Sequence, residues 1–316
     1  MSDTTQIAEA NAKIMDGPNV PGPETARSEK TRSLAQDAFR DLVRRPMFLV
    51  SAVLILGILT IAAFPSLFTS VDPLACDLKH SMEGPSGSAW FGYNFQGCDV
   101  YSQTIYGTRN SVIVGVLTTA FSLVIGGLIG VLGGFFGKWT DALLSFVTNV
   151  FFGLPLLLAA IVILNNFRDE KGMRNAGVMA VVLTLTVVGW MSMARVMRGA
   201  VMQVKQADYV AAARSLGAST SRMMFRHVLP NSVTPLIVVA TISLGAVIGA
   251  EATLSFLGIG IRPPAISWGV MISEAQQRIS SGLHPLLFPS GMLTITVLAF
   301  IMLGDAVRDA FDPKLR

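Results

Sequence analysis

The sequence has few charged residues and few of the residues that build catalytic or metal sites. Only 14% of its 316 residues are charged, and three are histidines. Its two cysteines, Cys76 and Cys98, form no CxxC pair, and the histidines lie far apart along the chain. This argues against a structural zinc site. We therefore predict no metal, no cofactor and no catalytic residue in this chain.

Two further features are missing. The 24 basic residues are spread over loops and tails, with no basic cluster interleaved with aromatic residues, so the sequence does not indicate a nucleic-acid-binding protein. The first 46 residues contain no apolar run of the kind found in a signal peptide, so we expect no cleaved leader.

The chain is instead rich in apolar residues, at 52%, with a mean hydropathy of +0.57. That balance is too apolar for an ordinary water-soluble domain. A bilayer core about 30 Å thick needs roughly 20 apolar residues, and hydrocarbon leaves backbone groups no partner outside a helix. We predict an all-α membrane protein with about six transmembrane helices, over residues 47–68, 111–136, 142–164, 176–193, 233–257 and 286–303.

The remaining segments alternate between the two sides of the membrane. Most basic residues fall on the side that carries both chain ends, so the positive-inside rule places both termini in the cytoplasm. Residues 1–46 are expected to form a cytoplasmic tail that ends in an amphipathic interfacial helix over 33–45. Residues 69–110 form an extracytoplasmic loop, 111–306 a core of five helices with a cytoplasmic segment at about 200–230, and 307–316 a cytoplasmic tail.

The predicted orientation puts both cysteines outside the cytoplasm. A disulfide between Cys76 and Cys98 is therefore our favoured hypothesis, and two free thiols in a loop are the alternative. By loop-closure estimates the bond would contribute about 3 kcal/mol to stability.

Glycine and proline mark the second and third predicted spans. Gly126, Gly130 and Gly134 recur every four residues, a spacing that lets helices approach closely. Packing within the chain is the favoured interpretation, and an interface with another subunit is the alternative. Pro155, which follows Gly153, lacks a backbone donor and predicts a bend in the third span.

The end of the glycine-rich stretch only superficially resembles a phosphate-binding loop. Leu132 stands where the first glycine of GxxxxGK[ST] belongs, and Trp139 stands where serine or threonine should bind magnesium. The sequence therefore predicts no nucleotide site, so uphill transport would need an energy source in another protein.

The cytoplasmic segment at about 200–230 has the pattern of two short helices joined by an elbow. The Ala-rich run from Asp208 ends at Gly217, which suits a left-handed helix terminus. A second helix can start at Ser219 and run toward Leu229-Pro230. Such an elbow could be a rigid knob for docking on another protein or an ordinary connector.

This segment resembles the EAA loop of binding-protein-dependent importer permeases. The matching residues are Ala212-Ala213, Gly217 and Leu229-Pro230, while Ala211 stands in place of the family's glutamate and His227 in place of its isoleucine. In that family the loop is the coupling helix that sits on the ATPase subunit. The resemblance thus implies that ATPase coupling falls to Ala211, Ala212, Ala213, Gly217, Leu229 and Pro230.

Other segments are similar to the C-type permease subunit of dipeptide and oligopeptide ABC importers. They are Trp90-Phe91-Gly92, Ile105 to Arg109, Glu251 to Gly258, Pro263-Pro264, Ser267-Trp268-Gly269, and Asp305 to Pro313. The resemblance implies the type I ABC importer permease fold and a place in the inner membrane as half of a peptide pathway. Nickel complexes or sugars are alternative cargoes, and a passive channel is the alternative of a different class.

The same resemblance implies the partners. A second permease subunit would complete a heterodimer, and two ATP-binding subunits or domains would bind ATP and magnesium. An extracytoplasmic peptide-binding protein would deliver the cargo.

Glu251 is the acidic residue that we predict inside a span. A charged group near the bilayer centre costs on the order of 3 kcal/mol, so its side chain should face protein or water. A hydrogen-bonded structural role is slightly favoured, and a role in lining or gating the pathway is the alternative.

Overall fold

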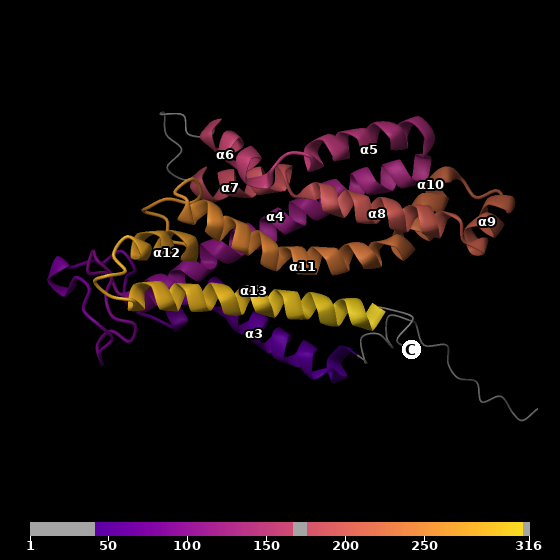
Figure 1. The fold of residues 1–316 in the computed structure, drawn as a ribbon. Helices are drawn as coiled ribbons and strands as arrows, with labels where there is room; N and C mark the ends of the chain where they lie inside the picture. The colour runs from indigo at the N-terminus through magenta and orange to yellow at the C-terminus, as the bar shows by residue number, and fades with distance from the viewer. Residues whose placement is uncertain (1–41, 167–175, 312–316) are drawn as a thin grey trace, which may run out of the picture. The chain divides into compact units, whose positions relative to one another are not determined.

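The computed structural model describes residues 42–166 and 176–311, and within these ranges it contains helices and loops but no β-strand. Most of the interfacial helix predicted over 33–45 lies outside the described residues. The helices are α3 (Pro46–Ala63), α4 (Val100–Phe136), α5 (Lys138–Phe152), α6 (Leu156–Asn166), α7 (Ala176–Val187), α8 (Trp190–Lys205), α9 (Asp208–Ser215), α10 (Thr220–Arg222), the π-helix η3 (Met223–Val228), α11 (Leu229–Phe256), α12 (Trp268–Gln276) and α13 (His284–Phe311), with short 3₁₀ turns η1 (Pro65–Leu67) and η2 (Leu78–His80) (Figure 1).

The described residues contain four to six candidate membrane spans. Four helices are long and apolar enough to span a bilayer, namely α3, α4, the continuous run Thr220–Phe256 that contains α11, and α13. Two further pairs are each broken by a bend, with 88° between α5 and α6 and 41° between α7 and α8. Counting each bent pair as one crossing gives six, in agreement with the predicted all-α membrane fold.

The bend between α5 and α6 lies at the predicted place. Helix α5 ends at Phe152 and α6 begins at Leu156, so Gly153 and Pro155 fall in the break. Proline cannot supply the backbone N–H that would continue the ladder of hydrogen bonds. The prediction of a bend at Pro155 is therefore confirmed.

The long helix α4 lies at the centre of the bundle and packs most extensively against α8. A Cβ atom placed on Gly126 would lie 2.5 Å from the carbonyl oxygen of Trp190, and one on Gly130 would lie 2.6 Å from that of Ala194. One on Gly134 would meet Arg198 in the same way, at 2.9 Å. The glycine stripe thus packs against α8 within the chain, which confirms the favoured interpretation.

Three helices extend beyond the predicted apolar runs. Helix α4 begins at Val100 rather than at residue 111, because Asp99 caps it by accepting the backbone N–H of Ser102 at 2.6 Å. Helix α8 continues past residue 193 to Lys205, and α13 continues past residue 303 to Phe311. Hydropathy detects only the apolar part of a helix, so polar extensions are missed.

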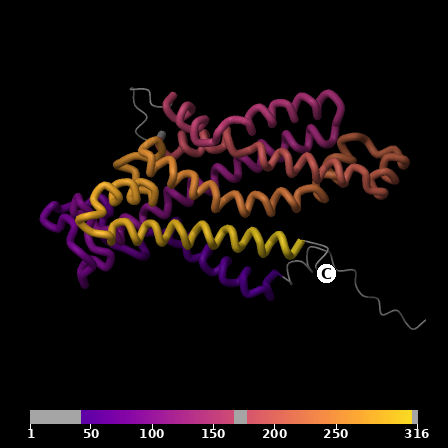
Figure 2. The backbone as a smooth tube through the Cα atoms, in the orientation of Figure 1, coloured from indigo at the N-terminus to yellow at the C-terminus, as the bar shows by residue number. Residues whose placement is uncertain are grey.

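The two ends of the bundle differ in character. The start of α3 and the end of α13 lie together at one end, where Arg45 pairs with Asp309 at 3.1 Å. Helices α9 and α10 project from that same end (Figure 2). The opposite end carries the loops between α3 and α4 and the short helix α12.

Candidate functional site

The elbow between α8 and α11 is anchored in the bundle by three buried side chains. Val210 of α9 is 1% exposed, and Met223 and Val228 of η3 are also buried. All three belong to a cluster that includes Met197 and Val201 of α8. The elbow is therefore a fixed projection, since its base is part of the hydrophobic core.

The tip of the elbow carries small side chains and one large apolar one. Ala211 and Ala212 are exposed, and Ala213 is half-buried. Gly217 has a φ of +80°, a left-handed conformation that turns the chain after α9, and Leu216 beside it is 89% exposed. Ser219 then caps α10 by accepting the N–H of Arg222 at 3.3 Å. The predicted helix, elbow and helix are all present.

The six predicted coupling residues do not all lie at this tip. Ala211, Ala212, Ala213 and Gly217 come together there, whereas Leu229 and Pro230 begin α11, beyond the π-helix. Proline has no backbone N–H, and Pro230 falls where the π-helix gives way to α11 within the continuous run Thr220–Phe256. Leu229 and Pro230 therefore lie inside the helix that follows the elbow, away from its tip.

Basic and aromatic side chains surround the tip. Arg214, Arg222 and Arg226 are exposed, and the ring of Phe225 is 60% exposed. Arginine and aromatic residues are enriched in protein interfaces, and an exposed Leu216 next to them adds apolar area. The arrangement suits docking in a groove of another protein.

Glu251 lies in α11 and is fully buried within this chain. Its Oε1 accepts hydrogen bonds from the hydroxyls of Ser255 at 2.7 Å and Ser267 at 3.0 Å. Ser267 in turn caps α12, and Ser255 accepts the backbone N–H of Ile261 at 3.0 Å. Glu251 therefore connects the outer part of α11 to the loop that leads into α12.

The network around Glu251 also reaches α4. Ser111 of α4 lies beside the carboxylate and accepts the backbone N–H of Trp268 at 3.3 Å. The buried indole of Trp268 donates to the carbonyl of Thr104 at 3.1 Å. Three elements, α4, α11 and α12, thus meet through buried polar contacts.

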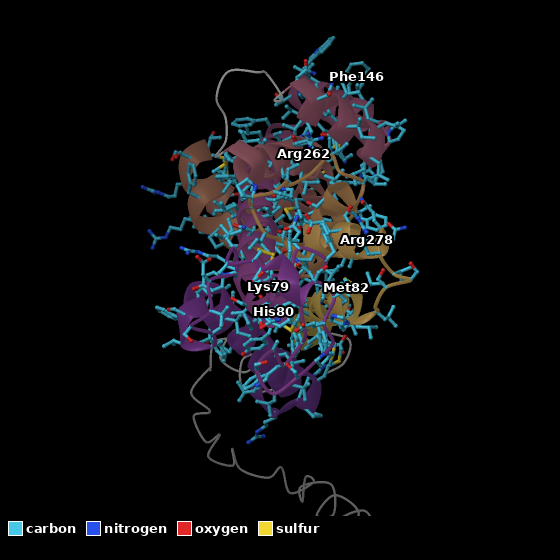
Figure 3. The ribbon with its side chains drawn as sticks, turned by 90° about the vertical axis from the view of Figure 1, so that its left-hand side faces the viewer. Lys79, His80, Met82, Phe146, Arg262 and Arg278 are labelled. Carbon is cyan, nitrogen blue, oxygen red and sulfur yellow. A yellow bond between two sulfur atoms is a disulfide. The ribbon has the colours of Figure 1, made fainter. Side chains whose placement is uncertain are left out.

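At the end opposite the elbow, Cys76 and Cys98 are joined by a disulfide. Asp99, next to Cys98, is buried, and this burial raises the pKa of its carboxyl group against the opposing effect of backbone hydrogen bonds from Ser102 and Tyr101. Figure 3 looks onto this end, where Lys79, His80 and Met82 of the loop and Arg262 and Arg278 of the later segments are labelled.

One cluster was not found from the sequence. Arg198 of α8 forms a two-pronged ion pair with Asp141 of α5, and Arg195 lies one turn earlier on α8. The fourth span was predicted to end at residue 193, so both arginines were expected in the cytoplasmic segment. Asp141, an acidic residue directly before the predicted third span, was the available signal for the ion pair. No three His, Cys, Asp or Glu side chains in the described ranges lie close enough to hold a metal ion.

A bundle of bent and straight spans with a projecting elbow at one end defines a class of membrane transport subunit. The model of the family described as "Binding-protein-dependent transport system inner membrane component" matches residues 102–316, and that of the "N-terminal TM domain of oligopeptide transport permease C" matches residues 33–85. The chain belongs to the binding-protein-dependent transport family and is a multi-pass inner-membrane permease subunit of an ABC importer.

Curated relatives cover nearly the whole chain. The oligopeptide transport system permease protein OppC of Bacillus subtilis is 34% identical over 289 residues, which are 92% of each chain. The dipeptide permease DppC of the same organism is 36% identical over 90% of this chain and 87% of its own length. The glutathione permease GsiD of Pectobacterium atrosepticum is 32% identical over 92% and 94%.

A solved structure has the same fold. A chain from the inward-facing MetNI methionine ABC transporter superposes with a TM-score of 0.55 and 21% identity, covering 66% of this chain and 97% of that one. The predicted type I importer permease fold is confirmed.

Proposed function

We propose that this chain forms half of the translocation pathway of an ATP-driven peptide importer. A second permease subunit completes the pathway as a heterodimer, and an extracytoplasmic peptide-binding protein delivers the cargo. The named substrates of the relatives, oligopeptides, dipeptides and glutathione, all contain peptide bonds and support this cargo over nickel complexes or sugars.

The observation that carries the proposal is the exposed elbow. Its base is anchored in the core, and its tip carries small side chains around Gly217. A projection that seats in a groove on another protein needs both features. Two ATP-binding subunits or domains, which hold ATP and magnesium, would receive this elbow and its counterpart on the second permease. Nucleotide would drive transport because it binds the two conformations of the assembly unequally.

The orientation belongs to the same proposal. The elbow, the start of α3 and the end of α13 lie at one end of the bundle, so an ATPase on the elbow places both chain ends in the cytoplasm. The disulfide then lies outside the cytoplasm, where oxidising conditions allow it to persist.

A bulky residue at the tip tests the coupling. Ala212→Trp should reduce the ATPase activity that co-purifies with the membrane complex at least tenfold, because the indole prevents close seating of the elbow. Ala212 is exposed, so folding should be unaffected. The measurement is ATP hydrolysis per mole of purified permease.

The matched control is Ala63→Trp at the far end of α3, where the alanine is also exposed. It should retain the wild-type amount of ATPase. Equal retention by both variants would show that the elbow does not contact the ATPase.

A further inference from the structure

A hollow of about 300 Å³ opens between α4, α5 and α8. Its lining includes Gly130 of α4, Ser145, Thr148 and Asn149 of α5, and Arg195 and Arg198 of α8. Most of the named polar groups are already engaged. Ser145 donates to Asp141, Thr148 donates to the carbonyl of Leu144, and Arg198 is paired with Asp141.

Arg195 differs from Arg198 in its partners. Its Nη2 donates to Oδ1 of Asn149 at 3.4 Å, and its guanidinium carbon lies 4.2 Å from the centroid of the Phe152 ring. No carboxylate pairs with Arg195 in the parts of the chain that the structure describes. An amide and a ring thus hold the guanidinium in place without neutralising it, so the hollow carries a net positive charge.

Arg195, Asn149 and Phe152 are exposed on this chain, so the guanidinium is open to a ligand. Lys205, at the end of α8, donates to the carbonyl of Phe135, next to residue 136 where the second span was predicted to end. Arg195 lies about 15 Å from Lys205 along α8, toward the bend with α7, at a rise of ~1.5 Å per residue. That is roughly half of the ~30 Å hydrocarbon thickness. A charge at such depth is costly and usually marks a transport pathway or a pair.

We propose that Arg195 binds the terminal carboxylate of a peptide as it passes through the inner half of the pathway. A guanidinium offers two parallel N–H donors that match a carboxylate, and the amide nitrogen of Asn149 can supply another. A lipid phosphate is the less favoured anion, because it would have to sink about 15 Å from the membrane surface to reach this depth. The inference rests on the proposed function and names the group that the pathway recognises.

The test compares two peptides in proteoliposomes that contain the complete importer and its binding protein. One peptide has a free C-terminal carboxylate and no acidic side chain, and the other is the same peptide with a C-terminal amide. Import of each is measured for the wild type, Arg195→Gln, Arg195→Lys and the control Arg44→Gln, which replaces an exposed arginine two residues before α3. The ratio of the two import rates is compared between variants. The binding protein's own preference for one peptide cancels in this comparison, since it is the same for every variant.

Arg195→Gln should slow import of the carboxylate peptide about tenfold more than that of the amide peptide, as expected for loss of one hydrogen bond to a charged group. The difference between the two peptides should be smaller for Arg195→Lys than for Arg195→Gln, because lysine keeps the charge but lacks the two parallel N–H donors. Arg195→Lys also provides the comparison if Arg195→Gln does not assemble. Arg44→Gln should change neither rate.

Three results would overturn the proposal. Equal slowing of both peptides would assign Arg195 a structural role only. A loss of dependence on phosphatidylglycerol in Arg195→Gln, with equal effects on both peptides, would assign the hollow to lipid. If the wild type imports neither peptide with ATP, the proposed function fails and this inference falls with it, whereas the first two results leave the proposed function intact.

Discussion

Gly130→Ala should lower the stability of the protein by about 2 kcal/mol, since overpacking of a close contact typically costs 1–3 kcal/mol. The new Cβ would lie 2.6 Å from both the carbonyl oxygen of Ala194 and the Cβ of Met197, so α4 and α8 would have to separate. Thermal unfolding of the purified protein in detergent should show a Tm lower by roughly 3 °C. Gly130→Leu should prevent recovery of folded protein.

Gly199→Ala provides the control, because Gly199 lies on α8 itself and a Cβ there would meet nothing within 4 Å. Its Tm should stay the same or rise slightly, since alanine favours a helix over glycine by about 1 kcal/mol. If both variants lose stability equally, backbone propensity rather than helix contact would explain the glycine stripe.

Glu251→Ala should destabilise the protein by about 3 kcal/mol and abolish transport. The substitution leaves the buried hydroxyls of Ser255 and Ser267 without their acceptor and creates a cavity where three elements meet. Glu251→Gln keeps an oxygen that can accept both hydrogen bonds, so it should fold and transport nearly as well as the wild type. Tm and ATP-dependent import, measured on both variants, check this expectation.

The two substitutions separate the roles considered for Glu251. Glu251→Gln that folds normally but does not transport would show that the charge itself acts in the pathway. Ser273→Ala is a useful reference, because Ser273 of α12 makes a single hydrogen bond, to the carbonyl of Phe256 at 2.8 Å. Its loss should cost only about 1 kcal/mol.

Much of the fold could be predicted because the determinants are local. Apolar runs give the spans, Pro155 gives the bend, and the spacing of Gly126, Gly130 and Gly134 indicates close helix packing. The elbow was likewise predictable, since an Ala-rich run, Gly217 and a capping Ser219 are each short-range signals.

The parts that escaped prediction depend on contacts between distant residues. Arg195 and Arg198 lower the hydropathy of α8, so the predicted span ended before them, yet packing on the glycines of α4 carries the helix on to Lys205. The ion pair of Arg198 with Asp141 and the contacts of Glu251 with Ser267 join separate elements, and no local pattern specifies such partners.

The most direct test of the account is peptide import into proteoliposomes that contain this chain with its second permease subunit and ATPase. The account predicts accumulation of peptide above its outside concentration, dependent on ATP and on the loaded binding protein. It also predicts that Ala212→Trp loses this accumulation while Ala63→Trp keeps it. Equilibration of peptide without ATP, unaffected by Ala212→Trp, would contradict the account and indicate a passive channel.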